Sequence, residues 1–252
     1  MRLFLIPDIY QGDPSLTLVE NDYHYLIRVL RYKPGHEFLG RDSNGNVFDL
    51  KITEITEDSC TLQVKESPGE YLKLPEIILY QCVCKGKKMD QIIRQATESG
   101  VSKIIPVVSD FSVSRIDTEK HGKLDRWNKI VREAIQQSGS LVNTVIENPV
   151  TIDNLLEINE PISAEGELGL FFHQEVLDSG SLHGYLSADP CRVFLVVGPE
   201  GGLSSRETEV LFNKKFKSIY LKTNILRAET AALYGIGAVQ TILLESENWI
   251  IK

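Results

Sequence analysis

The sequence is poor in cysteine, and its four cysteines are irregularly spaced, at positions 60, 82, 84 and 191. A small fold stapled by disulfides needs a dense framework of cysteines in a short chain, so this class is excluded. Cys82 and Cys84 alternate with Val83 and are predicted to point to one side of a strand as small core residues. A zinc site would need two further ligands nearby, and the sequence offers none, so no metal is expected. We expect reduced thiols and a cytoplasmic protein.

Long apolar runs are also missing. No segment reaches the roughly 20 apolar residues of a membrane-spanning helix, and residues 1–11 lack the apolar core and cleavage site of a signal peptide. The composition, 42% hydrophobic and 25% charged, is that of an ordinary globular protein. A length of 252 residues fits one large domain or two small ones, with no membrane partner expected.

Positive charge is in deficit, because 27 Lys and Arg stand against 35 Asp and Glu, for a net charge of −8. This balance excludes a uniformly basic nucleic-acid-binding surface. The deficit is largest in residues 1–72, which carry seven Lys and Arg against twelve Asp and Glu. Residues 84–103 carry an excess of positive charge, with five Lys and Arg against two Asp and Glu, so a local basic patch remains for an RNA partner.

The most informative segment lies at residues 191–207, CRVFLVVGPEGGLSSRE. Residues 193–197 form an apolar, β-branched run typical of a buried strand, and the glycines of residues 198–202 allow a tight turn. Ser204 or Ser205 can cap a following helix, and Glu207 stands at capping-box spacing from Ser204. This order leaves free backbone amides for a nucleotide-like ligand. A dinucleotide fingerprint and a phosphate loop are excluded by their spacing, and a plain tight turn remains the alternative.

A second strand and turn follow at residues 218–224, before an apolar helix that starts at Leu226. The two segments, GPEGGLSSRE and LKTNILRAETA, closely resemble the RsmE family of 16S ribosomal RNA (uracil-N3)-methyltransferases, of the SPOUT superfamily. The resemblance extends over essentially the whole chain. It implies an α/β fold with a SPOUT-type parallel sheet, helices on both faces and a C-terminal trefoil knot, preceded by a small PUA-like β-barrel domain. It also implies S-adenosylmethionine as the cofactor.

Residues 1–72 are predicted to form the PUA-like RNA-binding β domain. Strands are expected at residues 47–55 and 60–64, with a hairpin turn at residues 43–46. Residues 24–38 predict a helix with Leu26, Val29 and Leu30 on its apolar face. The string also resembles the H-x-x-x-VLR-x-x-x-G element of the family, which implies that Arg28 and Arg31 contact RNA.

Residues 73–252 are predicted to form the methyltransferase domain. From residue 76 onward strands and helices alternate, which favours a mostly parallel sheet covered on both faces. The lysines of residues 85–88 crowd a helix start, against the helix dipole. KGKKMD resembles a family motif, and so does SDFSV in residues 109–113. The RNA-binding residues so implied in this domain are Lys85, Lys87, Lys88, Arg94, Ser112 and Arg115.

The resemblance also implies a cofactor site and two catalytic residues. Arg227 is expected to stabilise the uracil anion, because a nearby cation lowers the pKa of an acid. Glu229 is expected to orient Arg227 or to accept the proton through water, and a structural ion pair of Arg227 with Glu229 or Glu200 is the alternative. The expected cofactor-binding residues are Phe172, His173, Val197, Gly198, Pro199, Glu200, Gly201, Gly202, Leu221, Asn224, Ile225, Leu226 and Ala231.

Two residues depart from the family pattern. Ser140 stands where an arginine is usual, which removes a positive contact, and Lys222 stands where a glycine is usual, where a positive φ would be strained. A catalytically silent RNA-binding protein is therefore the second hypothesis, and an enzyme acting on a small nucleotide is the third. The broad apolar run of residues 231–244 predicts a homodimer. The expected substrate is 16S rRNA or the assembled small ribosomal subunit.

Overall fold

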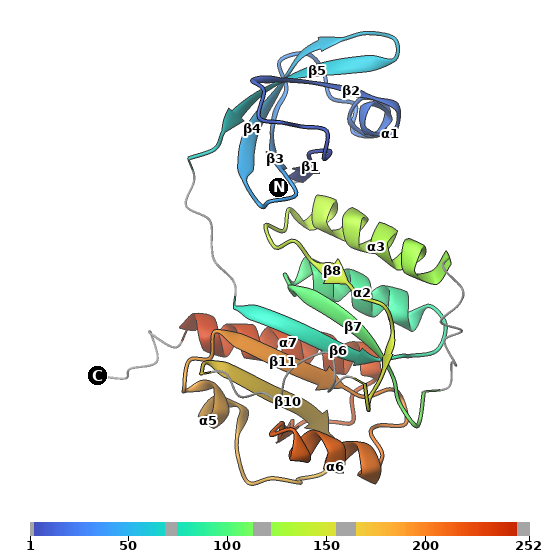
Figure 1. Cartoon of the computed structure of the whole chain (residues 1–252), viewed down its shortest axis with the longest axis vertical. Helices are drawn as coiled ribbons and strands as arrows, with labels where there is room; N and C mark the ends of the chain where they lie inside the picture. Colours follow the sequence, from blue (N-terminus) through green and yellow to red (C-terminus); the bar gives the residue numbers. More distant parts are fainter. Residues whose placement is uncertain (1–2, 69–74, 113–121, 155–164, 246–252) are drawn as a thin grey trace. The chain divides into compact units, whose positions relative to one another are not determined.

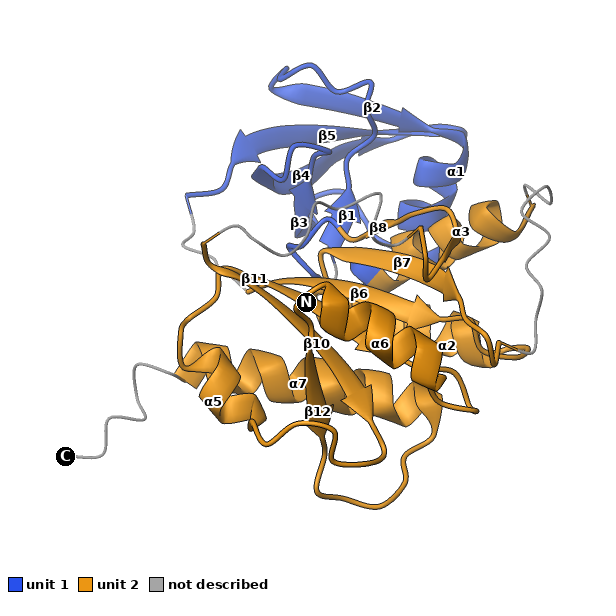
Figure 2. Ribbon diagram, turned by 60° about the horizontal axis from the view of Figure 1, so that its bottom comes forward, with its two compact units in different colours: residues 1–72, 135–143 blue, residues 73–134, 144–252 orange. Residues whose placement is uncertain are grey.

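The computed structural model describes residues 3–68, 75–112, 122–154 and 165–245. The chain divides into two compact units, which Figure 2 colours separately. Unit 1 comprises Met1–Leu72 together with Ile135–Asn143, and unit 2 comprises Lys73–Ala134 and Thr144–Lys252. Each unit has a sheet of its own.

Unit 1 is built on a five-stranded sheet with the order β1-β3-β4-β5-β2. β1 pairs with β3 in parallel, and the other neighbours are antiparallel. The predicted hairpin is present, since Asp42 accepts a hydrogen bond from the Asn46 amide and Gly45 has a φ of 91°. The elements are β1 (Leu3–Leu5), β2 (Ser15–Val19), α1 (Glu20–Tyr23), η1 (His24–Val29), β3 (Glu37–Arg41), β4 (Val47–Ile55) and β5 (Ser59–Glu66).

The segment after β2 differs from its predicted geometry. We expected an α-helix with Leu26, Val29 and Leu30 on one face, but η1 is a π-helix, in which the Leu30 amide donates to Tyr25 O at 2.9 Å, five residues back. The wider turn rotates Val29 outward, where it is 56% exposed, while Leu26 is fully buried. Arg31 ends the segment in the left-handed region, with a φ of 57°.

A buried arginine holds the distant segment 135–143 in unit 1. Arg41, on β3, is only 1% exposed. Its guanidinium donates to Leu141 O at 2.5 Å and to Asn143 Oδ1 at 3.3 Å. Burial lowers the pKa of Arg41 from its ordinary value. The hydrogen bonds partly compensate the cost of burying this charge.

Unit 2 is built on a sheet in which every pairing is parallel, with the order β12-β10-β11-β6-β7-β8 and β9 also paired to β7 (Figure 1). The predicted mostly parallel sheet is thus confirmed. The short strands β8 and β9 were not predicted. The strands are β6 (Glu76–Cys82), β7 (Lys103–Val108), β8 (Val145–Ile146), β9 (Val150–Thr151), β10 (Glu167–His173), β11 (Arg192–Val197) and β12 (Lys217–Tyr220).

Helices cover both faces of this sheet. α2 and α7 pack against each other, and α6 covers the opposite face, where Leu211 joins the core formed by alternate strand residues such as Tyr80 and Val196 (Figure 2). The described residues contain no helix long and apolar enough to cross a membrane. The helices are α2 (Lys88–Glu98), α3 (Gly122–Ser138), α5 (Leu182–Leu186), α6 (Ser205–Asn213) and α7 (Ala228–Glu245).

The cysteines are all free thiols, as expected. Cys60, Cys82 and Cys84 are buried, and Cys191 is exposed. Burial raises the pKa of the Cys60 thiol to about 11 and that of Cys84 to about 12. The buried thiols therefore serve as small core side chains and are poor nucleophiles at neutral pH.

Candidate active site

The first loop of the site follows β11 and doubles back on itself. The Gly202 amide donates to Pro199 O at 2.9 Å, and Gly202 has a φ of 75°. A Cβ on Gly198 would lie 3.2 Å from the carbonyl carbon of Gly202, so the two ends of the loop meet closely. Glycine is needed at both positions, for the close approach at Gly198 and for the left-handed backbone at Gly202.

The loop then enters α6 through the predicted capping box, which is confirmed. Ser204 is the N-cap; its Oγ accepts from the Glu207 amide at 3.2 Å, and Glu207 Oε2 accepts from the Ser204 amide at 2.8 Å. Glu207 is fully buried, and its other oxygen, Oε1, accepts from the Asp110 amide at 2.8 Å. One carboxylate therefore joins the end of this loop to the turn that follows β7.

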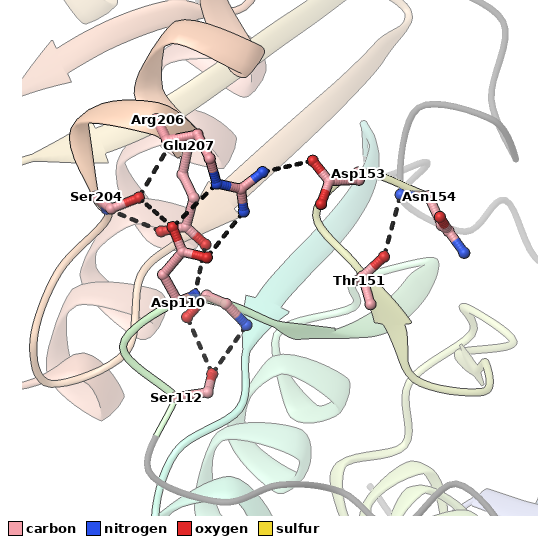
Figure 3. A network of polar contacts seen from close by, with 9 residues as sticks. Asp110, Ser112, Thr151, Asp153, Asn154, Ser204, Arg206 and Glu207 are labelled. Carbon is pink, nitrogen blue, oxygen red and sulfur yellow. Dashed lines mark hydrogen bonds and ion pairs between the residues drawn. The ribbon is translucent and has the colours of Figure 1, made fainter.

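Around this carboxylate lies a second set of charged contacts, shown in Figure 3. Arg206 binds Asp110 through two hydrogen bonds of 2.8 and 3.2 Å, and it also donates to Asp153 Oδ1 at 2.6 Å. Ser204 Oγ donates to Asp110 Oδ2 at 2.5 Å. The hydrogen bonds from Arg206 and then from Ser204 lower the pKa of Asp110. Nothing in the sequence indicated this network, except that Asp110 closely follows the carboxyl end of a strand.

The second loop connects β12 to α7. The Thr223 amide donates to Leu221 O at 2.6 Å in a tight turn. Lys222 is not among the residues with positive φ, which in the described part of the chain outside glycine are Glu20, Arg31, Asp189 and Lys215. The lysine therefore causes no backbone strain here. Ile225 is 89% exposed, an unusual position for a large aliphatic side chain.

The two loops enclose a cavity of about 400 Å³ at the carboxyl ends of β10, β11 and β12. This is the edge of a parallel α/β sheet at which ligands bind, and the volume suits a small molecule. The cavity is lined by Lys88, Phe172, His173, Gln174, Val197, Gly198, Pro199, Glu200, Gly202, Leu203, Tyr220, Leu221, Thr223, Asn224, Ile225, Leu226, Arg227, Ala228 and Ala231.

This lining includes every residue predicted to bind the cofactor except Gly201. Gly201 instead lies against Phe111, because a Cβ on Gly201 would be 2.9 Å from the Phe111 Cβ. Phe172 packs closely on α7 at Gly235, where a Cβ would lie 2.1 Å from its ring. The His173 imidazole accepts from the Glu175 amide at 3.1 Å, which fixes the ring locally. Sequence reasoning missed Gln174, Leu203, Tyr220, Thr223 and Ala228, all of which lie within two positions of a predicted residue.

Two cationic side chains line the cavity, and only one of them is ion-paired within the described part of the chain. Lys88 forms an ion pair with Glu200 at 2.7 Å. Burial tends to raise the pKa of Glu200, but the hydrogen bond from Lys88 gives it a net lowering. Arg227 lines the cavity and has no ion-pair or side-chain hydrogen-bond partner among the described residues. Glu229 Oε2 is buried without a hydrogen-bond partner among the described residues. The hydrogen bond with Glu200, and to a lesser extent the nearby Glu229, raise the pKa of Lys88.

The residues predicted to bind RNA lie in both units. In unit 1, Arg28 and Arg31 are exposed, and the Arg28 guanidinium lies 5.9 Å from the centroid of the Tyr23 ring. In unit 2, Lys85 and Lys87 are exposed, and Arg94 pairs with Glu133 at 3.8 Å. Ser112 caps its own turn by accepting from the Ser109 amide, and Arg115 lies outside the described residues. In the described part of the chain, no three His, Cys, Asp or Glu side chains gather as metal ligands.

A cavity between two loops at the carboxyl edge of a parallel sheet defines unit 2 as a ligand-binding α/β domain. The family description "RNA methyltransferase domain" matches residues 71–240, and "RNA methyltransferase PUA domain" matches residues 19–65. The chain belongs to the family of ribosomal RNA small subunit methyltransferase E, and the resemblance noted in the sequence is confirmed.

Individual relatives are similar over nearly their whole length. The Aquifex aeolicus ribosomal RNA small subunit methyltransferase E is 32% identical over 82% of this chain and 86% of its own. The Bacillus subtilis protein of the same name is 27% identical over 93% of this chain and 94% of its own. A crystal structure of the Neisseria gonorrhoeae enzyme bound to S-adenosyl methionine superposes with a TM-score of 0.83, at 25% identity, over 96% of this chain and 98% of that chain.

The buried carboxylate of Glu207 generates a testable prediction. Glu207→Gln should lower the free energy of unfolding by about 2 kcal/mol or more, because an amide group would face one of the two backbone N–H donors. Chemical denaturation measures this change. Glu209→Gln, on the exposed side of the same helix, is the control and should stay within about 0.5 kcal/mol of the parent. Equal stability of both variants would contradict the account.

Proposed function

We propose that this protein transfers a methyl group from S-adenosylmethionine to N3 of a uracil in 16S rRNA of the small ribosomal subunit, and so acts in ribosome biogenesis in the cytoplasm. The observation that carries the proposal is the cavity itself. It is built by the two loops whose sequence resembles this family, in a chain that belongs to it. The predicted trefoil knot of these loops stays a prediction.

The residues of the cavity fit S-adenosylmethionine. Ile225, Leu226 and Leu221 offer apolar surface from the second loop, which suits a planar adenine. The first loop contributes backbone groups rather than side chains, since Gly198 and Gly202 leave the main chain open to close approach. Glu200, although paired with Lys88, lies in the lining and can accept from a ribose or an ammonium group. When bound, the cofactor supplies an electrophilic sulfonium methyl group.

The chain's own contribution to the chemistry is electrostatic. Neutral uracil carries a proton on N3 and is a poor nucleophile, so the site must favour the anion. The unpaired guanidinium of Arg227 in the cavity wall can do so, because a nearby cation lowers the pKa of an acid. An Arg227 ion pair with Glu200 or Glu229 is not among the contacts of the described residues, and Glu200 is already bound to Lys88. We assign Glu229 as the group that accepts the proton through water.

RNA binding is proposed for both domains. We assign residues 1–72 as the RNA-binding domain and residues 73–252 as the methyltransferase domain, whose segment 135–143 packs in unit 1. Arg28 and Arg31 would contact phosphates from the first, together with a set of basic residues and one serine from the second. That set comprises Lys85, Lys87, Lys88, Arg94, Ser112 and Arg115. Counterion release at these contacts makes the affinity fall as salt rises.

A homodimer is also proposed, because α7 keeps apolar side chains outside its buried face. Leu233, Tyr234 and Leu244 are 39%, 51% and 40% exposed, and association would remove this area from water. Light scattering that reports the mass of a single chain at micromolar concentration would contradict this proposal.

Nucleoside analysis tests the function directly. Small ribosomal subunits from cells lacking this protein are incubated with the protein and S-adenosylmethionine, and the RNA is digested and analysed by mass spectrometry. We expect one new 3-methyluridine per subunit. Binding of the subunit without methylation would instead support the second hypothesis, a silent RNA-binding protein. A methyl group on carbon 5 would contradict the N3 chemistry.

The role of Arg227 is tested by substitution. Arg227→Ala should cut turnover by roughly a hundredfold, the usual scale for removing one electrostatic stabiliser. The melting temperature should stay nearly unchanged, because the side chain has no ion-pair partner among the described residues. Cofactor affinity should also change little, because the charge of Arg227 is assigned to the uracil anion and not to the cofactor. Raising the pH should recover part of the loss, since hydroxide then removes the N3 proton. Arg227→Lys should recover little.

Lys222→Ala removes a cation from the same loop and is the matched control, with turnover expected near the parent's. The catalytic assignment would be wrong if Arg227→Ala melted early, bound the cofactor poorly and showed no recovery at high pH. A pH–rate profile, calorimetry and thermal melting on the two variants separate these outcomes.

The left-handed backbone at Arg31 predicts a trade-off between stability and RNA binding. Arg31→Gly should raise the free energy of unfolding by about 1 kcal/mol, because glycine adopts this φ without strain. It should also weaken binding to small-subunit rRNA and reduce the salt slope by about one unit. Lys215→Gly, at a φ of 67° after α6, should stabilise similarly but leave RNA binding unchanged. Equal RNA binding by both variants would show that Arg31 contacts no phosphate.

A further inference from the structure

Beside the cavity stands an aromatic side chain that the mechanism has not used. Phe111 is 49% exposed, although burying the surface of a phenyl ring would stabilise the folded protein. It lies in the short turn of residues 109–112 that follows β7. A turn of this kind is commonly made of small polar residues, so a large exposed ring there calls for a reason.

The backbone that carries this ring is held by hydrogen bonds at Asp110 and Ser112. The Ser112 amide donates to Ser109 O at 3.0 Å and closes the turn. The Asp110 amide donates to Glu207, and the Asp110 carboxylate is bound by Arg206 and Ser204. Figure 3 shows these contacts converging on Asp110, the immediate neighbour of Phe111. These contacts anchor the backbone of the turn, and with it the Cα of Phe111, in place.

The position of the ring relates it to the cofactor cavity. The Phe111 Cβ lies against Gly201, where a Cβ would be only 2.9 Å away. The two neighbours of Gly201, Glu200 and Gly202, both line the cavity. Gly201 thus contacts the ring while its two neighbours line the cavity, so Phe111 lies directly beside the residues that line the cavity.

We propose that Phe111 is the surface on which the target uracil stacks during methyl transfer. The inference rests on the proposed function. N3–H is the Watson–Crick donor of uracil, so a base that is methylated there must first be unpaired and flipped out of the RNA helix. Enzymes receive such flipped bases between aromatic or apolar side chains. An exposed ring on an anchored turn, next to the methyl-donor cavity, meets this need, and such stacking contributes about 1–3 kcal/mol per base.

Kinetics of three variants test the assignment with tritiated S-adenosylmethionine and small ribosomal subunits from cells lacking the protein. Phe111→Leu should lower kcat/KM about tenfold to a hundredfold, while S-adenosylmethionine affinity and melting temperature stay unchanged. Phe111→Tyr should keep most of the activity, because it keeps the ring. Phe212→Leu is the control, since Phe212 is a 38% exposed phenylalanine on α6 of the same unit, and its kcat/KM should match the parent's. Equal kcat/KM for Phe111→Leu and the parent would overturn the proposal.

Photo-crosslinking gives a readout that does not depend on turnover. A small-subunit rRNA transcript made with 5-iodouridine is irradiated with the protein in the presence of S-adenosylhomocysteine, and the attached residue is identified by mass spectrometry. We expect attachment at Phe111, lost in Phe111→Leu. Attachment only at other residues would overturn the stacking proposal and leave the proposed function standing. A parent protein that neither methylates nor crosslinks would overturn both.

Discussion

The buried carboxylate of Glu207 is the contact on which the site depends. It binds two backbone amides, Ser204 at the end of the first cofactor loop and Asp110 at the turn after β7. A buried charge is tolerated only where hydrogen bonds replace its hydration, and each of its oxygens accepts one here. Because one side chain satisfies donors from two segments, the loop and the turn cannot move independently. This contact therefore fixes the first loop, which lines the cavity, relative to the turn that carries Phe111.

Much of the fold could be predicted because its signals are local. The strands β6, β7, β10 and β11 are apolar runs, and the capping box of α6 depends on two residues three positions apart. The residues of the loops that line the cavity were predicted through the family resemblance, which rests on the two motifs that follow β11 and β12. Short strands such as β8, with two residues, have no periodicity to detect. Local patterns therefore located the strands and the helix cap, and the resemblance located the loops around the cavity.

Other features depend on distant partners and could not be predicted. Glu207 was recognised as a helix cap, but its second oxygen bonds a residue 97 positions away. Arg41 was not singled out, because its bonds to the segment 135–143 span about 100 residues. Val29 was placed on an apolar face because a period of 3.6 residues was assumed, whereas the π-helix η1 leaves it exposed. Arg227 was assigned through a resemblance, and only the structure shows that Glu200, one of its two expected partners, pairs with Lys88 instead.

The central claim is that the first cofactor loop is anchored at its helix end before any ligand binds, whereas the second loop is not. Amide hydrogen exchange of the ligand-free protein, measured by NMR, tests this most directly. The amides of Ser204 and Asp110 should exchange slowly without ligand and change little on adding S-adenosylmethionine. Those of Asn224 and Ile225, which donate to no backbone carbonyl in the described structure, should exchange fast and slow on binding. Fast exchange at Ser204 and Asp110 until ligand is added would contradict the account.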